Sequence, residues 1–109
     1  MAAVNLEDAN FEDVIEDEDF VFVDFWGQNC APCRLMAPVV DELAADLAGR
    51  VVVAKLNVHE NPIAAHDAGI RGVPTFVLYH DGKPVAHHLG RATKVQLREL
   101  IEKHLAAGE

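Results

Sequence analysis

The sequence predicts an α/β domain with a central mixed β-sheet and helices on both faces of the sheet. Two nearly continuous apolar runs rich in β-branched and aromatic residues, Phe20–Trp26 and Val51–Val58, are typical of strands buried on both faces. The segment between them has apolar residues at three- and four-residue spacing, which indicates a helix. The three segments therefore form a β-α-β unit with parallel strands and a right-handed crossover. An Asp-Gly pair in residues 80–83 predicts an antiparallel hairpin later in the chain, so the sheet is mixed.

The chain has 109 residues, the size of one domain with one core, and we expect a single domain over residues 1–109. Its formal net charge of −9 argues against nucleic-acid binding, which needs clustered lysine and arginine. No apolar stretch approaches the roughly 20 residues that span a bilayer, so no membrane partner is expected. Much of the acidic surplus lies in residues 7–19, either as a solvated face or as a site for a basic partner.

The N-terminal half places its apolar residues at regular intervals. A short strand is expected near Ala3–Asn5, and a helix over residues 6–17 carries apolar residues on one side. The helix of the β-α-β unit ends before Gly49. Its apolar residues are Leu35, Met36, Val39, Val40, Leu43 and Leu47.

The second half continues with a helix and a hairpin. Asn61 and Pro62 are expected as the N-cap and first residue of a helix that stops at Gly69. The hairpin strands are expected at Thr75–Tyr79 and Pro84–Leu89.

The last helix is expected to open with Thr93 and Gln96, which have the spacing of a capping box. Its apolar residues are Val95, Leu97, Leu100, Ile101 and Leu105.

The two cysteines, Cys30 and Cys33, follow the first long strand with Pro32 between them. Cys30 is expected at the N-terminus of the next helix, where free N–H groups and the helix dipole lower the pKa of its thiol below the reference of about 8.5. Three-residue spacing lets the two sulfurs close a short disulfide, so the pair can cycle between dithiol and disulfide. No metal is expected, because a closed zinc site needs four ligands and no second cysteine pair or paired histidines complete one. Two buried cysteines that act as small hydrophobic residues are the alternative.

Asp24 interrupts the apolar run Phe20–Trp26. Burial is expected to raise the pKa of its carboxyl and leave an acid that exchanges protons near neutral pH. The alternative is an ion pair with Lys55 in the neighbouring strand, and the two readings are compatible.

Five blocks of the sequence occur in the order found in thioredoxins. They are the C-x-x-C motif with VDFW before it and APVVDEL after it, VAKLNVHENP, GIRGVPT, and the hairpin glycine with the later HLG. The chain resembles the thioredoxin family over essentially its whole length. The resemblance implies the thioredoxin fold, and it implies that Asp24 helps to deprotonate Cys33 while Lys55 modulates Asp24.

The resemblance also implies where substrates bind. Val73–Pro74 would be a cis peptide bond opposite the disulfide, with the Val73 backbone free to pair with an extended substrate segment. A shallow apolar groove would be formed by Trp26, Ala31, Pro32, Gly72, Val73, Pro74, Leu89 and Gly90. Taken singly, each of these residues is also explained by turn geometry or by the core.

The usual family pattern is Trp-Ala-x-Trp-Cys-Gly-Pro-Cys-Lys, and this chain departs from it at Gly27, Asn29, Ala31 and Arg34. Arg34 keeps the positive charge. Asn29 removes an exposed aromatic residue, which is expected to weaken partner binding, and Ala31 is expected to shift the redox poise. His59 stands where the family commonly carries Asp, which weakens a contact near the site.

These observations predict a thiol–disulfide oxidoreductase that acts mainly as a protein disulfide reductase and needs no cofactor. Cys30 would attack the substrate disulfide and Cys33 would resolve the mixed disulfide. A thioredoxin reductase would restore the dithiol, because the chain has no dinucleotide fingerprint. We expect a cytoplasmic protein, since the N-terminal residues lack the basic and apolar regions of a signal peptide. We also expect a monomer. The alternative is a binding or adaptor module with a shifted redox poise and restricted partners.

Overall fold

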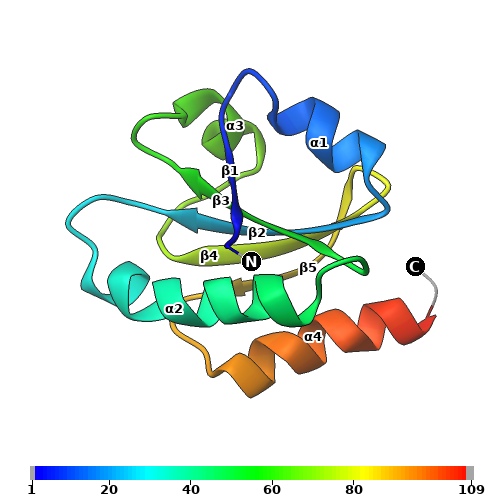
Figure 1. The fold of residues 1–109 in the computed structure, drawn as a ribbon. Helices are drawn as coiled ribbons and strands as arrows, with labels where there is room; N and C mark the ends of the chain where they lie inside the picture. Colours follow the sequence, from blue (N-terminus) through cyan, green and yellow to red (C-terminus); the bar gives the residue numbers. More distant parts are fainter. Residues whose placement is uncertain (1, 108–109) are drawn as a thin grey trace.

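The structure, a computed structural model, describes residues 2–107 (Figure 1). It contains five strands and four helices in the order β1 (Val4–Leu6), α1 (Phe11–Asp17), β2 (Phe20–Trp26), α2 (Ala31–Asp46), β3 (Val52–Asn57), α3 (Pro62–Asp67), β4 (Thr75–His80), β5 (Lys83–Leu89) and α4 (Lys94–Ala107). In the described part of the chain, no helix is long and apolar enough to cross a membrane.

The sheet is mixed, as the sequence predicts. Its strand order is β1-β3-β2-β4-β5, with β1, β3 and β2 parallel and β4 and β5 antiparallel to their neighbours. The register of β2 and β3 places Asp24 opposite Lys55 and Trp26 opposite Asn57. The β-α-β unit therefore brings the two charged residues singled out in the sequence onto adjacent strands.

Helices cover both faces of the sheet (Figure 1). Phe22 packs with buried residues of α2 and α4, whereas Val21, Val23 and Phe25 pack with buried residues of α1 and α3. Because side chains alternate along a strand, Asp24 shares the face of Phe22 and lies on the side of the sheet covered by α2.

The expected helix over residues 6–17 is wrong at its start, because α1 begins at Phe11. Leu6 belongs to β1, where it pairs with Leu56 and is 2% exposed. The intervening residues form a turn in which Asn10 Oδ1 accepts the Glu7 N–H group at 2.8 Å. Leu6 fits the apolar side of a helix by spacing alone, but the pairing of β1 with β3 decides its conformation.

The predicted hairpin and last helix are confirmed. Asp81 and Gly82 connect β4 to β5 with φ values of 51° and 80°, the positive values that a two-residue type I′ turn requires. Before α4, Thr93 Oγ1 accepts the Gln96 N–H group at 3.1 Å, and Gln96 Oε1 accepts the Thr93 N–H group at 2.8 Å. This reciprocal pair is the capping box predicted from the sequence.

Helix α3 begins at Pro62 after Asn61, as predicted, but a distant residue caps it. Asp8 Oδ1 accepts the Ala64 N–H group at 2.7 Å, and the Asp8 N–H group donates to Asn61 Oδ1 at 2.9 Å. Just before this helix, Asn57 Oδ1 accepts the His59 N–H group at 2.9 Å. These bonds fix the loop that leads from β3 toward the site described next.

Candidate active site

The two cysteines lie where β2 gives way to α2, as predicted. Cys30 is the N-cap of α2 with extended backbone, and Pro32 lies in the first turn. The sulfurs of Cys30 and Cys33 are joined in a disulfide, and their Cα atoms lie 5.2 Å apart. This separation is ordinary for a disulfide, so the pair closes at the start of the helix without displacing it.

A hydrogen-bond donor of the helix N-terminus faces Cys30. The Cys33 N–H group donates to Cys30 Sγ at 3.2 Å, and the Cys30 carbonyl accepts the Arg34 N–H group at 3.2 Å. A free N–H group at a helix N-terminus favours negative charge on the atom that it faces. A donor placed in this way suits a thiolate, the nucleophilic form of a cysteine, at Cys30.

The two cysteines differ in accessibility. Cys30 is half-buried, whereas Cys33, in the first turn of α2, is 4% exposed. Cys30 is therefore the more accessible of the two cysteines to another molecule. The two cysteines of one motif therefore differ in their exposure to solvent.

The loop before β4 faces the disulfide. The Val73–Pro74 bond is cis, as the resemblance implies, and the Val73 carbonyl oxygen lies 3.9 Å from Cys30 Sγ. The Gly90 N–H group donates to the Pro74 carbonyl at 2.8 Å, which joins this loop to the end of β5. Three segments that are distant in sequence therefore meet at the disulfide.

The remaining residues of the expected groove lie on these same segments. Leu89 is 62% exposed and reaches back to Gly72, where an added Cβ would lie 3.3 Å from Leu89 Cδ1. Trp26 and Pro32 are half-buried, and Ala31 is exposed in the first turn of α2. The structure thus brings the Val73–Pro74 loop and the end of β5 to the disulfide, and substrate binding by the expected residues stays a prediction.

Asp24 is buried, as predicted from its place in an apolar strand. It is 1% exposed, and its Oδ1 atom has no hydrogen-bond partner within residues 2–107. Burial raises the pKa of its carboxyl from 3.8 to about 7, although the charge of Lys55 opposes this shift. Asp24 can therefore hold or release a proton near neutral pH, because desolvation disfavours its charged form.

Lys55 does not form the ion pair considered from the sequence. Among residues 2–107, no Lys55 nitrogen lies within 4.0 Å of an Asp24 oxygen. Instead, Lys55 Nζ lies 5.7 Å from the centroid of the Trp26 ring, a cation–π geometry. Lys55 therefore acts on Asp24 through its charge at longer range.

Two departures from the family pattern, Gly27 and His59, are linked by contact, which sequence reasoning missed. A Cβ atom added at Gly27 would lie 2.9 Å from His59 Nε2 and 3.3 Å from Val73 Cγ2. The imidazole thus occupies the space that the alanine usual in the family would need. The sequence signal that could have revealed this contact is that Gly27 and His59 both differ from the usual family residues. Local spacing does not connect two positions so far apart in the chain.

Gly27→Ala is expected to push the His59 ring aside and to leave the domain folded. His59 is exposed, so its ring can rotate away, and we expect the free energy of unfolding to fall by less than about 1 kcal/mol. Urea unfolding measures this loss, and side-chain NMR of His59 reports the displacement. In a His59→Ala background, where the ring is absent, Gly27→Ala should lower the free energy of unfolding by less than it does in the wild-type chain. An equal loss in both backgrounds would show that the two residues are not linked.

Asn29 has a backbone role that the sequence did not reveal. Its φ is 55°, in the left-handed region that asparagine tolerates better than most residues. The residue beside Cys30 must therefore adopt a left-handed backbone conformation. An aromatic residue introduced there would adopt this conformation at an energetic cost.

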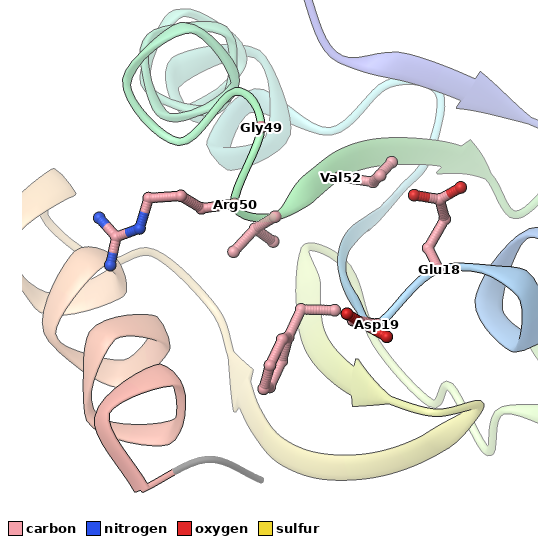
Figure 2. A pocket seen from close by; sticks show the side chains of 7 residues that line it. Glu18, Asp19, Gly49, Arg50 and Val52 are labelled. Atoms are coloured by element: carbon pink, nitrogen blue, oxygen red, sulfur yellow. The ribbon is translucent and has the colours of Figure 1, made fainter.

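A separate cavity of about 310 Å³ lies at the opposite end of β2 (Figure 2). Its lining includes Glu18, Asp19 and Arg50. In Figure 2 the Arg50 side chain extends toward α4, where it pairs with Glu102 at 2.7 Å. The cavity contributes nothing to the disulfide site, which lies at the other end of the strand.

The sequence and fold match known proteins. The profile of the family described as Thioredoxin matches residues 2–103. The chain is 47% identical over 96 residues to the thioredoxin of Alicyclobacillus acidocaldarius, covering 88% of this chain and 91% of that one. It is 43% identical over 105 residues to the thioredoxin of Staphylococcus saprophyticus, covering 96% of this chain and all of that one.

The fold is also similar to a solved structure of a mutant thioredoxin from Halobacterium salinarum. The TM-score is 0.85 at 37% sequence identity, over 94% of this chain and 89% of that one. With a disulfide at the start of α2 and matches over most of its length, the chain belongs to the thioredoxin family and is a thiol–disulfide oxidoreductase that reduces protein disulfides.

Proposed function

We propose that Cys30 is the attacking cysteine of this disulfide reductase and that Cys33 is the resolving one. The observation that carries the proposal is that Cys30 is half-buried and its Sγ atom accepts the Cys33 N–H group at 3.2 Å, at the helix N-terminus. This position supplies both access for a substrate and stabilisation of a thiolate. Cys33, at 4% exposure, reacts only with a sulfur already bonded to Cys30.

The reaction has two exchange steps. The Cys30 thiolate attacks one sulfur of the substrate disulfide, forms the mixed disulfide, and expels the other substrate sulfur as a thiolate that takes up a proton. Cys33 then loses its proton and attacks Cys30 Sγ. The Cys30–Cys33 disulfide forms, and the second substrate sulfur leaves as a thiol. The substrate disulfide gains two electrons and two protons, and the protein dithiol loses them.

Asp24 is proposed to accept the proton of Cys33 in the second step. It lies on the sheet face that α2 covers, and its pKa of about 7 suits proton exchange near neutral pH. In the described part of the chain, no hydrogen-bond partner occupies its Oδ1 atom. Lys55 is proposed as a positioning residue, because its charge lowers the pKa of Asp24 from the higher value that burial alone would give.

The surface around the disulfide is proposed to bind substrate segments in extended form. The Val73 backbone, beside Cys30 Sγ, is offered to a strand-like segment, as in β-augmentation. Trp26, Pro32 and Leu89 supply apolar contacts next to it. The other members of the proposed contact surface are Ala31, Gly72, Pro74 and Gly90.

The partners follow from this chemistry. Protein disulfides accept the electrons, and a thioredoxin reductase restores the Cys30–Cys33 dithiol. We propose that the single domain works as a monomer in the cytoplasm, where such a reductase keeps it reduced.

Reduction of insulin in the presence of dithiothreitol tests the function. The wild-type chain should accelerate the reduction, and Cys30→Ser/Cys33→Ser should not exceed the uncatalysed rate. A thioredoxin-fold adaptor without redox turnover would leave the insulin rate the same with wild type and double variant.

Asn29→Trp and Ala31→Gly are expected to change different properties. A tryptophan beside Cys30 adds rigid apolar contact area, so turnover with insulin or a thioredoxin reductase should rise about two- to tenfold while the redox potential barely moves. Ala31 lies between the two cysteines, so Ala31→Gly should change the relative stability of dithiol and disulfide and thereby shift the redox potential. A modest bias is measurable, because 30 mV corresponds to about 1.4 kcal/mol. Redox equilibration with glutathione measures the potential of each variant.

Asn29→Ala is the matched control for this pair. It meets the same left-handed backbone requirement as Asn29→Trp but adds no aromatic contact. Its turnover should not exceed that of the wild-type chain. The division of roles is wrong if Asn29→Trp moves only the potential, or if Ala31→Gly changes only partner affinity.

A further inference from the structure

We propose that the surface around the disulfide selects substrate segments with aspartate or glutamate beside the cystine, through Arg34, Arg71 and Arg91. The proposal rests on the proposed substrate-binding role of this surface. It names the substrate class by charge, which neither the C-x-x-C motif nor the apolar contacts determine.

Each arginine adjoins one of the three segments that meet at the disulfide. Arg34 follows Cys33 in the first turn of α2, and its N–H group bonds to the Cys30 carbonyl. Arg71 precedes Gly72 in the loop that leads to the cis bond, and Arg91 follows Gly90, which bonds to that loop. All three arginine residues are exposed, and their backbones belong to or directly follow the segments that meet at the disulfide, so their long side chains have room to reach a substrate bound there.

The turn that carries Arg91 is held in place. His88 Nε2 lies 3.1 Å from the Arg91 carbonyl oxygen, and the ring centroids of His88 and Phe76 are 6.5 Å apart. Phe76 is fully buried in β4. The backbone that presents Arg91 is therefore tied to the core.

These three arginines are free to pair with a substrate. The chain has 18 acidic and 9 basic residues, so its cations have many possible internal partners. Arg50, Lys94 and Arg98 do form ion pairs with acidic side chains, at shortest distances of 2.7, 2.8 and 3.4 Å. Within residues 2–107, by contrast, the guanidinium groups of Arg34, Arg71 and Arg91 make no ion pair with the many carboxylates available.

The acidic residues gather elsewhere. Eight of the 18 lie in residues 7–19, around α1, which packs on the sheet face opposite to α2. At physiological ionic strength, charges more than about 8 Å apart are largely screened, so the acidic residues around α1 contribute little to the field on the opposite sheet face. Glu60, which follows His59, is an acid of the loop after β3 and reduces this field on the Trp26 side.

Net charge and local charge therefore predict opposite preferences. A net charge of −9 acting as a whole would repel acidic substrates and attract basic ones. Three guanidinium groups at the site attract carboxylates, which they can bind in a bidentate manner. The sign of the preference separates these two descriptions.

Three disulfide-bonded peptides of equal length test the proposal, with aspartate, serine or lysine next to the cystine. The pre-reduced full-length protein is mixed with each peptide, and acid quenching with chromatography gives the second-order rate constant. At about 20 mM salt, we expect the aspartate peptide to react about tenfold faster than the serine peptide and the lysine peptide to react more slowly. Raising the salt to about 500 mM should reduce the tenfold ratio to about twofold or less.

Two charge-matched double variants locate the effect. Arg71→Gln/Arg91→Gln should lose most of the aspartate preference, whereas Lys83→Gln/Lys103→Gln, which removes two exposed cations elsewhere, should retain it. Arg34→Gln, measured separately, should lower the preference further. Each ratio is taken to the serine peptide, which corrects for changes in thiol reactivity.

The outcomes distinguish this proposal from the function on which it rests. Equal rate constants for the three peptides, fastest reaction with the lysine peptide, or equal loss in both double variants would overturn the charge preference and leave disulfide reduction intact. Failure of the pre-reduced wild-type chain to reduce even the serine peptide would instead contradict the proposed function.

Discussion

Asp24→Asn should make the oxidised protein more stable at alkaline pH and leave its stability at acidic pH nearly unchanged. The native carboxyl has a pKa raised by burial to about 7 from 3.8, so the folded chain binds more protons than the unfolded chain between these values. Stability contributed by the protonated carboxyl is fully present below about pH 4 and is lost as the pH rises through about 7. The total loss is about 4 kcal/mol, at about 1.4 kcal/mol for each unit of pKa.

Urea unfolding of the oxidised protein at about pH 4, 6 and 8 measures this difference. The gap between Asp24→Asn and wild type should widen from near zero to about 4 kcal/mol. The matched control is Asp17→Asn, an exposed carboxyl at the end of α1, whose gap should stay small at every pH. A gap for Asp24→Asn that does not change with pH would contradict the assignment of a neutral buried acid.

The same variant should slow the second exchange step. Without a carboxylate to accept the proton of Cys33, resolution of the mixed disulfide should be at least about tenfold slower at pH 7. Attack by Cys30 should change little, because Asp24 is buried on the α2 side of the sheet and away from solvent. Rapid-quench kinetics separate the two steps, and equal slowing of both would remove the specific role of Asp24.

Cys30→Ser and Cys33→Ser should each lower steady-state insulin reduction by more than about a hundredfold. Both sulfurs are needed for a full cycle, since each exchange step consumes one thiolate. Serine is close in size to cysteine, so both variants should remain folded, which circular dichroism checks. Substantial turnover in either variant would mean that the Cys30–Cys33 pair is not the reacting group.

The sequence predicted features that depend on neighbouring residues. A strand followed by C-x-x-C and an apolar helix placed Cys30 at the start of α2, and a carboxyl within an apolar strand identified Asp24 as buried. Thr93 and Gln96 predicted the capping box of α4, because such caps form within one helical turn.

Features that depend on distant contacts could not be predicted this way. Leu6 fits a helical pattern, and only its pairing with β3 shows that it belongs to a strand. Asp8 caps α3, and His59 lies against Gly27, through contacts between remote segments. That Asp24 and Lys55, both described in the structure, form no ion pair depends on side-chain geometry, although both residues and their adjacent strands were predicted.

The order of attack by the two cysteines is the central claim, and trapping of the mixed disulfide tests it most directly. Each reduced single-serine variant is incubated with insulin, quenched by alkylation, and analysed by mass spectrometry without reductant. Cys33→Ser should accumulate a stable adduct through Cys30, while Cys30→Ser should trap almost none, because Cys33 is buried. Equal adduct formation by the two variants, or trapping through Cys33 alone, would contradict the assignment.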